Sequence, residues 1–565
     1  MNMKSIKSIK YLFLLVIMTL SSCDSLLNKQ FDDTLTDGQI LRDPSLMMGM
    51  QTSIYNYMPR NDFSYNIIGG AMLDCATDDG MESSGASDIH NMTNGAWSPN
   101  KTIDDQWWRL YAGIRKCYLF FKYIDQSTIT NNIVMDANGK PTENSQLRER
   151  LKAETVFLKA LFYSELIKRY GNVPMVTSIL APDTALLDIP RTPYAVVVDS
   201  IVKWCDQASA ILPVVYSDGA KGHATKGAAL MLKSRTLLYA ASPLNNPIND
   251  KEKWRLAAEA AKAVIDFSES NSNVYALNNV FATPFSTPFD KEIIMPGKYY
   301  NRNDIEFSNV PNGYSKGQGH TNPTQNLVDA FEIKVNGIYV TYDKTNPTHE
   351  ANMYSVDRDP RLLATVLYNG VTFKTRKVET FVGGLDGLNK TIDYTKTGYY
   401  LKKFVLPEIN LDLGTAMKPR AWILYRYAEA LLNYAEAQNE YLGSPDASVY
   451  QRLSQVRVRS MGIAGNLDAS LNWTKEQMRA RIQNECRVEF AFEEHRFWDV
   501  RRWNKGSELF NVPIYGISIS KSGTTLTSTR FKVEDRVFSP QMYFCPISQY
   551  SVLKAPITGQ TDSWK

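Results

Sequence analysis

The chain has 565 residues, of which 44% are hydrophobic and 22% are charged. These proportions are typical of a packed globular protein and exclude an intrinsically disordered one. The net charge of +4 is small for a chain of this length, so we expect no nucleic-acid partner.

The first element along the chain is a lipoprotein signal peptide, which we predict at residues 1–22. Three lysines precede an apolar run at residues 11–20, and this run is too short to span a bilayer because a spanning helix needs ~20 apolar residues. Two serines then lead to Cys23, and the string L-S-S-C matches the bacterial lipobox, which directs acylation of the cysteine. The alternatives are an ordinary signal peptide with an incidental cysteine, or a core strand. The lipobox interpretation predicts a mature chain that starts at Cys23, is held to membrane lipid by acyl chains, and uses residues 23–44 as a tether.

Five further cysteines follow the lipobox, widely separated and without a C-x-x-C pair: Cys75, Cys117, Cys205, Cys486 and Cys545. An odd number at such spacing favours neither a disulfide framework nor a zinc site. The five histidines are also not at metal-ligand spacing. We therefore expect no cofactor, although the sequence leaves a structural cation open.

Helical patterns dominate residues 45–268. In the stretch "LRERLKAETVFLKALFYSELIKRYGNVP", apolar residues recur close to a 3.6-residue period, Gly171 suits the position just past a helix end, and Pro174 follows it. The stretches at residues 225–243 and 251–267 are rich in alanine and leucine, so neighbouring helices can pack closely.

The pattern changes twice in the second half of the chain. Residues 269–419 contain short strand-like runs such as "EIIMPGKYY", "GVTFKT" and "YLKKFVL" between irregular connections. Helical patterns return at residues 420–503, in "AWILYRYAEALLNYAEAQNEYLG" and in a long stretch that opens with a capping box, Thr474 to Gln477. Residues 504–565 are extended and rich in loops. We predict a mainly α fold in which helix pairs form the scaffold, with a loop-rich subdomain that contains short strands.

Several of these segments resemble the signature segments of the SusD/RagB family. They are "NPTQNLVDAFE", "DPRL", "RYAEALLNYAEA" and "RIQNECRVEFAFEEHRFWDVRRW". Upstream, "WWRLYAGIRKC", "AETVFLKALFYSELIKRYGNVP" and "KGAALMLKSRTLLYAASP" are similar to the family's N-terminal half, and the end of the chain is similar to its C-terminus. The resemblance covers nearly the whole chain in the expected order. Cys486 and Cys545 depart from the usual residue types at their positions.

The resemblance implies a lipoprotein on the outer face of the outer membrane, anchored through Cys23. It implies a scaffold of tetratricopeptide-like helix pairs at residues 45–268, and a RagB/SusD region at residues 269–565 whose irregular part carries the ligand site. It further implies a non-enzymatic protein that captures oligosaccharides for a SusC-like TonB-dependent barrel. Two alternatives remain: the same architecture with peptides or another nutrient as cargo, and, more distantly, a surface glycoside hydrolase.

The charged motifs favour structure over catalysis. Charges around Glu485 and Glu489 alternate with apolar residues, which is typical of ion pairs that join helices. Glu493 and Glu494 are adjacent, whereas a glycosidase needs two carboxyl groups ~5–10 Å apart across an open cleft. The G-x-S-x-G string around Ser315 lacks the preceding strand and following helix of a nucleophile elbow. We interpret the nearby His320 as a hydrogen-bonding loop residue.

Aromatic residues are the candidates for ligand binding, since the chain has 31 tyrosines and 10 tryptophans. Sugar rings present apolar faces that stack on aromatic rings, and neutral glycans need no charged group to hold them. Core packing explains most of these rings. Four of them lie in polar, loop-like sequence, where we predict ligand contact: Trp97, Tyr299, Tyr300 and Tyr314. No family motif fixes these four positions.

Overall fold

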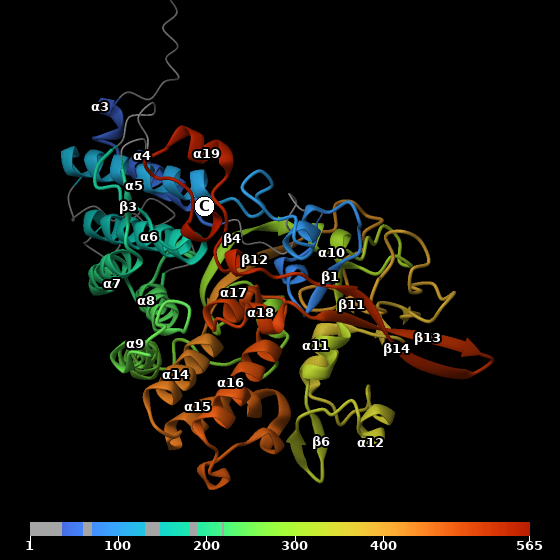
Figure 1. Ribbon diagram of the computed structural model, residues 1–565. Helices are drawn as coiled ribbons and strands as arrows, with labels where there is room; N and C mark the ends of the chain where they lie inside the picture. The colour runs from blue at the N-terminus through green and yellow to red at the C-terminus, as the bar shows by residue number, and fades with distance from the viewer. Residues whose placement is uncertain (1–36, 60–69, 130–146, 180–188, 217–219) are drawn as a thin grey trace, which may run out of the picture.

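A stack of packed helices forms one side of the molecule in the computed structural model (Figure 1). The structure describes residues 37–59, 70–129, 147–179, 189–216 and 220–565, so the predicted signal peptide and Cys23 lie outside it. The longer helices are α4 (Pro44–Ile54), α5 (Trp107–Gln126), α6 (Leu147–Tyr170), α7 (Tyr194–Ile211), α8 (Lys226–Ala241), α9 (Lys251–Ser270), α14 (Tyr427–Tyr441), α15 (Ala447–Met461), α16 (Lys475–Glu489) and α17 (His495–Arg502). The shorter ones are α3 (Asp37–Ile40), α10 (Asp304–Asn309), α11 (Gln325–Ala330), α12 (Pro347–Ala351), α13 (Pro360–Thr365), α18 (Gly506–Leu509) and α19 (Gln549–Lys554).

Consecutive long helices contact one another from α5 to α9, and α9 continues the stack by packing on α14. We call α4–α9 with α14–α17 the scaffold, and residues 271–426 between α9 and α14 the loop-rich region. One buried hydrophobic cluster contains residues of both parts, for example Phe162 and Leu431 of the scaffold and Ile294 of the loop-rich region. The two parts therefore share one core.

The local signals explain where these helices begin and end. Helix α6 ends at Tyr170 because Gly171 takes a left-handed conformation (φ +69°), and its N–H donates to the Ile167 carbonyl. Helix α16 begins with the predicted capping box, in which Thr474 and Gln477 satisfy each other's backbone N–H groups. These predictions are confirmed, as are the helices predicted near residues 225–243 and 251–267.

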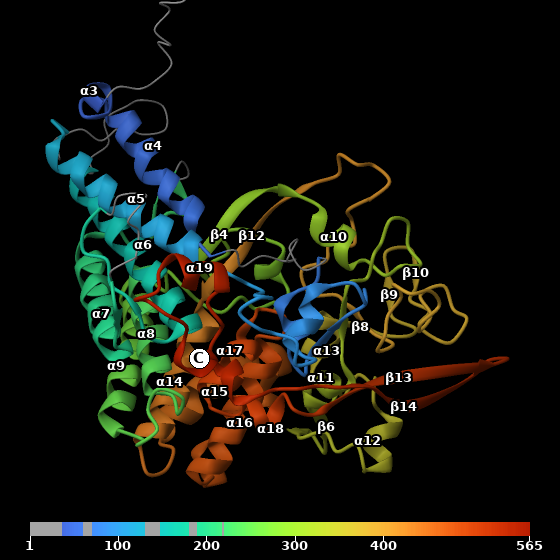
Figure 2. The ribbon, with the colours of Figure 1, turned by 45° about the horizontal axis from the view of Figure 1, so that its top comes forward.

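The strands within the described residues form seven separate two-stranded antiparallel ribbons. The pairs are β1 (Gly80–Glu82) with β5 (Thr321–Pro323), β2 (Val173–Pro174) with β3 (Arg191–Thr192), β4 (Ile293–Arg302) with β12 (Lys418–Arg426), β6 (Ile333–Val335) with β7 (Ile338–Val340), β8 (Val366–Leu367) with β11 (Tyr400–Leu401), β9 (Thr372–Phe373) with β10 (Arg376–Lys377), and β13 (Pro513–Ser522) with β14 (Thr525–Asp535). Figure 2 shows the β13–β14 hairpin projecting from the body. The predicted mainly α class is confirmed.

The prediction that residues 420–503 are helical is wrong at residues 420–426. This segment continues β12, and Ile423 lies opposite Pro296 of β4 instead of on a helical stripe. The run "AWILY" combines aromatic and branched side chains, which suit a strand, and pairing with β4 overrides the helical preference of the sequence that follows. Helix α14 begins at Tyr427.

The long helix predicted to run to Trp503 is also interrupted, since α16 ends at Glu489 and α17 begins at His495. Phe492 and Glu494 take left-handed conformations, with φ of +61° and +65°. Their backbone N–H groups donate to the two carboxylate oxygens of Asp74, each at 3.1 Å. A buried carboxylate from the N-terminal part of the chain thus accepts the hydrogen bonds that a continuous helix would have made internally.

A buried set of ion pairs joins the scaffold to the loop-rich region. The carboxylate of Glu489 in α16 lies 2.9 Å from a guanidinium nitrogen of Arg361 in α13, 2.6 Å from one of Arg426 in β12 and 2.5 Å from one of Arg459 in α15. All four side chains are at most 3% exposed. Further buried carboxylates extend the set: Glu292, Glu332, Glu485 and Glu493. The predicted role of these charges in joining helices is confirmed.

Burial alone would raise the pKa of Glu489, but the charges of Arg459, Arg426 and Arg361 outweigh it and hold this pKa well below its usual value. A carboxyl group with a lowered folded-state pKa stabilises the fold above its unfolded pKa of ~4.3, and this stabilisation is lost as the pH falls through the folded-state value. At neutral pH the contribution of Glu489 is therefore complete.

We expect Glu489→Gln to lower the free energy of unfolding by ~3–5 kcal/mol, because it leaves three buried guanidinium groups short of a counter-charge. Urea denaturation measures this quantity. The control is Asp266→Asn, which removes the exposed Lys262–Asp266 pair of α9 and should cost less than ~0.5 kcal/mol. Equally small losses in both variants would contradict the structural role of the ion pairs.

Candidate functional site

Two of the predicted ligand-binding tyrosines lie on the exposed part of the β4–β12 ribbon. Tyr299 is 48% exposed and Tyr300 is 39% exposed, and they lie opposite Ala421 and Arg420 of β12. The first four residues of β4 are buried, so the ribbon leaves the core before it reaches these two rings. The sequence-based expectation that both rings are accessible is met.

The two tyrosines cannot stack on the same sugar ring, because consecutive side chains of a strand point to opposite faces. Tyr300 shares its face with Lys298 and Arg302, whose cationic groups lie 5.7 and 4.8 Å from the centre of its ring. Tyr299 is on the other face, where its ring lies 4.9 Å from that of Phe289, tilted by 52°. Each face of the ribbon thus offers one aromatic ring in a different setting.

Tyr314 belongs to a different part of the loop-rich region. Its hydroxyl donates to the Phe373 carbonyl at 3.0 Å, and the Arg376 guanidinium lies 3.7 Å from the centre of its ring. Burial, only partly opposed by Arg376, raises the pKa of Tyr314 to about 12. Tyr314 is half-buried and one ring face is covered, so it offers less surface to a ligand than the ribbon tyrosines do.

The fourth candidate, Trp97, is 2% exposed. The expectation that its loop leaves the ring accessible is wrong. The Trp564 ring packs edge-on against it at 5.8 Å, and the Arg501 guanidinium lies 6.0 Å from its centre. Trp97 is thus a packing residue between the N-terminal loops and the C-terminal end of the chain.

The serine motif is held by close backbone packing. A Cβ atom at Gly313 would lie 2.4 Å from the Leu385 carbonyl oxygen, and one at Gly317 would lie 2.5 Å from that of Pro311, so both positions require glycine. Ser315 bonds to Asp412, while the ring nitrogens of His320 contact Glu82 and Gln318. The segment is a turn region that follows helix α10 and precedes strand β5, the reverse of the strand–turn–helix order of a nucleophile elbow.

The adjacent acidic residues Glu493 and Glu494 are both buried. Glu493 bonds to Arg426 and to Lys403, both buried, at 2.7 Å each. Glu494 is 3% exposed, and its backbone bonds to Asp74. Neither carboxylate faces an open cleft. Among the described residues, no group of three or more histidine, cysteine or acidic side chains is placed to hold a metal ion.

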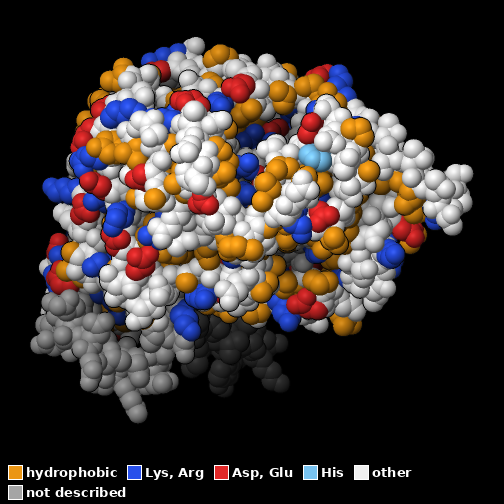
Figure 3. Space-filling view, turned by 90° about the horizontal axis from the view of Figure 1, so that it is seen from below, with side chains coloured by type: hydrophobic (Ala, Val, Ile, Leu, Met, Phe, Trp, Pro, Cys, Tyr) orange, Lys and Arg blue, Asp and Glu red, His pale blue; other side chains and the backbone are white. Residues whose placement is uncertain are grey.

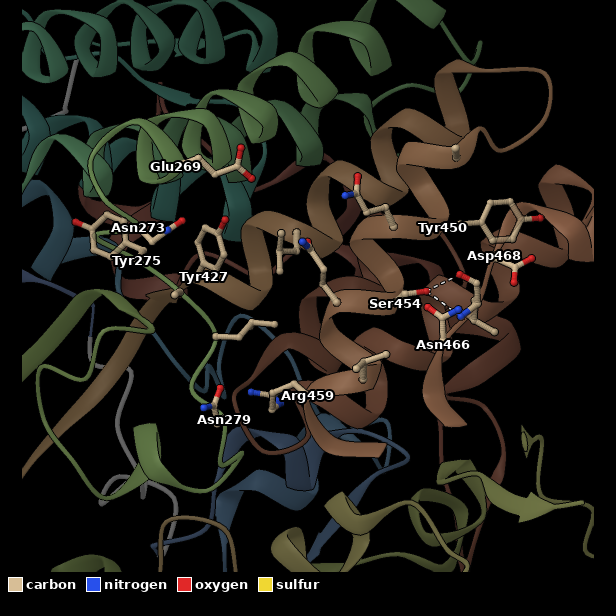
Figure 4. A pocket seen from close by; sticks show the side chains of 18 of the residues that line it. Glu269, Asn273, Tyr275, Asn279, Tyr427, Tyr450, Ser454, Arg459, Asn466 and Asp468 are labelled. Atoms are coloured by element: carbon tan, nitrogen blue, oxygen red, sulfur yellow. Dashed lines mark hydrogen bonds between the residues drawn. The ribbon is translucent and has the colours of Figure 1, made fainter. Parts of the chain in front are cut away.

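A cavity of about 940 Å³ lies away from all four predicted aromatics, between the end of α9, the loop after it, α14, α15 and residues 466–469 (Figure 4). Three tyrosines and several amides line it. Our sequence analysis missed this site because its lining comes from three separate segments. One signal was present: Tyr275 lies in "NSNVYALNN", a polar stretch of the kind that we used to select the other aromatics.

Comparison with known proteins identifies the family. Residues 286–564 match the family model described as the SusD family, and residues 44–238 match a model described as "Starch-binding associating with outer membrane". The chain belongs to the SusD/RagB family. Two similar relatives come from Formosa agariphila. SusD-like protein P25 is 21% identical over 89% of this chain and 90% of its own length, and SusD-like protein P38 is 23% identical over 91% and 95%.

Solved structures have the same fold. A SusD-like protein from Bacteroides fragilis is 25% identical and has a TM-score of 0.76, with 93% of this chain and 98% of that chain covered. Another structure from this species, described as a SusD-like carbohydrate-binding protein, is 21% identical with a TM-score of 0.75, and the coverage is 91% and 99%. These similarities confirm the predicted tetratricopeptide-like architecture.

Membership of the SusD/RagB family associates the protein with the outer membrane. In the part of the chain that the structure describes, every helix is too short or too polar to cross a membrane. The anchor predicted at Cys23 lies outside that part and stays a prediction.

The burial of Trp97 separates it experimentally from the ribbon tyrosines. We expect Trp97→Ala to lower the free energy of unfolding by ~3–5 kcal/mol, as truncation of a large core side chain does. Tyr299→Ala should change it by less than ~1 kcal/mol, because half of the ring is already in water. Denaturant unfolding of both variants tests this, and an unchanged stability of Trp97→Ala together with lost ligand binding would restore the original prediction for Trp97.

Proposed function

We propose that this protein captures oligosaccharides at the cell surface and passes them, chemically unchanged, to a SusC-like TonB-dependent transporter. The observation that carries the proposal is the exposure of Tyr299 and Tyr300 in the loop-rich region of a SusD/RagB protein. A solved structure of the same fold, described as a carbohydrate-binding protein, supports it.

The aromatic rings and the exposed amide of the ribbon suit a hydroxyl-rich ligand. An aromatic ring that stacks on a sugar ring should contribute ~0.5–1.5 kcal/mol beyond the area that it buries. Asn301 follows the two tyrosines, is exposed, and can donate and accept hydrogen bonds to hydroxyl groups. Because the two rings are on opposite faces of the ribbon, an oligosaccharide that contacts both must pass over its edge, which favours a chain of several sugars over a single one.

Capture without chemistry agrees with the environment of the charged candidates. The carboxylates of Glu493 and Glu494 are buried, and Ser315 has an aspartate in place of a histidine as its partner. A lipid-anchored protein that holds its cargo without cleaving it must deliver it to another protein. The transporter proposed here supplies that step.

We expect the Tyr299→Ala and Tyr300→Ala double variant to bind its oligosaccharide roughly ten- to a hundredfold more weakly, because two stacking contacts and their buried area are lost. Calorimetric titration of the mature protein, purified in detergent, with neutral malto-, cello-, xylo- and manno-oligosaccharides measures this change. The control is Tyr515→Ala, which removes a 37% exposed tyrosine from the β13–β14 ribbon and should leave the affinity unchanged.

Two results would contradict the proposal. One is binding of short peptides in place of every oligosaccharide, which would favour the alternative cargo. The other is release of shortened sugars from the titrated oligosaccharide, detected by chromatography, which would make the protein an enzyme.

The anchor is tested by Cys23→Ala. We expect this variant to lack acyl chains and to leave the membrane fraction after a carbonate wash, because the chain then has no lipid to hold it. Mass spectrometry of the N-terminal peptide measures acylation directly. A Cys23→Ala protein that still sediments with the outer membrane would refute the lipobox interpretation.

A further inference from the structure

We propose that the cavity between α9, α14 and α15 is a second binding site, separate from the ribbon, for an uncharged saccharide. It lies between the scaffold helices and the loop after α9, below the β4–β12 ribbon in Figure 1, and neither Tyr299 nor Tyr300 lines it. Its assignment does not require the ribbon to bind a ligand.

The inner wall of the cavity is aromatic and rigid. The Tyr275 hydroxyl is hydrogen-bonded to Thr225, and the Tyr450 hydroxyl accepts from the Trp473 backbone N–H, each at 2.9 Å. Both side chains are therefore fixed from behind. Tyr427, the first residue of α14, lies toward the same end of the cavity as Tyr275, and Tyr450 lies toward the other (Figure 4). The exposed fractions of these rings are 6% for Tyr275, 8% for Tyr427 and 2% for Tyr450, so they form a rigid floor and leave most of the contact with a ligand to the rim.

The rim consists of exposed amides on three segments. Five such residues surround the opening: Asn273, Asn279, Gln451, Gln455 and Asn466. The side chains of Asn279, Gln451 and Asn466 form no hydrogen bond within the described part of the chain, so their donors and acceptors are available to a ligand. An amide both donates and accepts, as a sugar hydroxyl does, which makes a ring of amides suited to hydroxyl groups.

The charges at the cavity disfavour an anionic ligand. Arg459 is neutralised by Glu292 at 3.3 Å and by Glu489, so its charge is already compensated. Glu269, which is paired with Arg452 at 3.2 Å, and Asp468 add two carboxylates to the lining, so Asp468 remains without a cationic partner among the described residues. On the face shown in Figure 3, basic and acidic side chains are interspersed, without a broad basic area. An uncharged saccharide is compatible with this lining. A uronic acid or a phosphate would find no cation among these lining residues that lacks a partner, and it would face the carboxylates.

The size of the cavity fits this occupant, since about 940 Å³ is within the range of ~300–1,000 Å³ that is typical of ligand pockets. A second site would also have a clear consequence. A polysaccharide that is held at one site meets the other at a raised effective concentration, so long chains are retained better than short ones.

Hydrogen–deuterium exchange of the mature protein in detergent tests the proposal, with neutral malto-, cello-, xylo- and manno-oligosaccharides as probes. We expect at least one of them to slow amide exchange in residues 271–279 and 462–470, and to do so equally in the Tyr299→Ala and Tyr300→Ala double variant. The Gln451→Ala and Asn466→Ala double variant should need about tenfold more oligosaccharide for the same protection, because two hydrogen bonds are lost. Gln207→Ala, which removes an exposed amide from α7, is the matched control. It should need no more oligosaccharide than the wild type does for the same protection.

Three results would overturn the second site. The first is that no probe protects these two segments, and the second is that the Gln451→Ala and Asn466→Ala double variant needs no more oligosaccharide than the wild type. The third is that an oligosaccharide of uronic acids protects the segments as well as neutral ones do. The two proposals fail separately. Protection of these segments without protection of the ribbon would refute the ribbon as the capture site and support the cavity.

Discussion

The carboxylate of Glu489, shared by three buried arginines, is the interaction on which the arrangement of this protein depends. Arg361 and Arg426 come from the loop-rich region, whereas Arg459 and Glu489 belong to the scaffold. Short ribbons of two to eleven residues could not hold an irregular region in place by their own backbone bonds. Buried ion pairs form directional contacts at defined points of the interface. Because a buried charge without a partner costs several kcal/mol, these pairs fix how the scaffold and the loop-rich region pack together.

This arrangement explains how exposed aromatics can be held in defined positions outside a helical core. The β4–β12 ribbon begins in the core, where Arg426 is fixed by three glutamates, and exposes Tyr299 and Tyr300 farther along β4. Its base is thus rigid and its outer part is accessible, which is the arrangement of a preformed binding surface. The second cavity has a comparable construction, since the rings of Tyr275 and Tyr450 are fixed from behind while the amides at its rim remain available.

Sequence patterns predicted the elements whose signals are local. The apolar period and Gly171 located α6, the capping box located the start of α16, and family motifs identified the fold. The errors occurred where distant residues decide the structure. Asp74 interrupts the predicted long helix from more than 400 positions away along the chain, and Trp564 buries Trp97 from the C-terminal end. The cavity was not predicted because three separate segments form it, and its lining residues in α14 and α15 follow ordinary helical patterns when each segment is considered alone.

The most direct test of this account is a crystal structure of the protein with a bound neutral oligosaccharide. The account predicts a sugar ring stacked on Tyr299 or Tyr300, with the register of β4 and β12 and the ion pairs of Glu489 unchanged from those described above. An oligosaccharide bound elsewhere with both tyrosines bare, or a ribbon that shifts its register on binding, would contradict it.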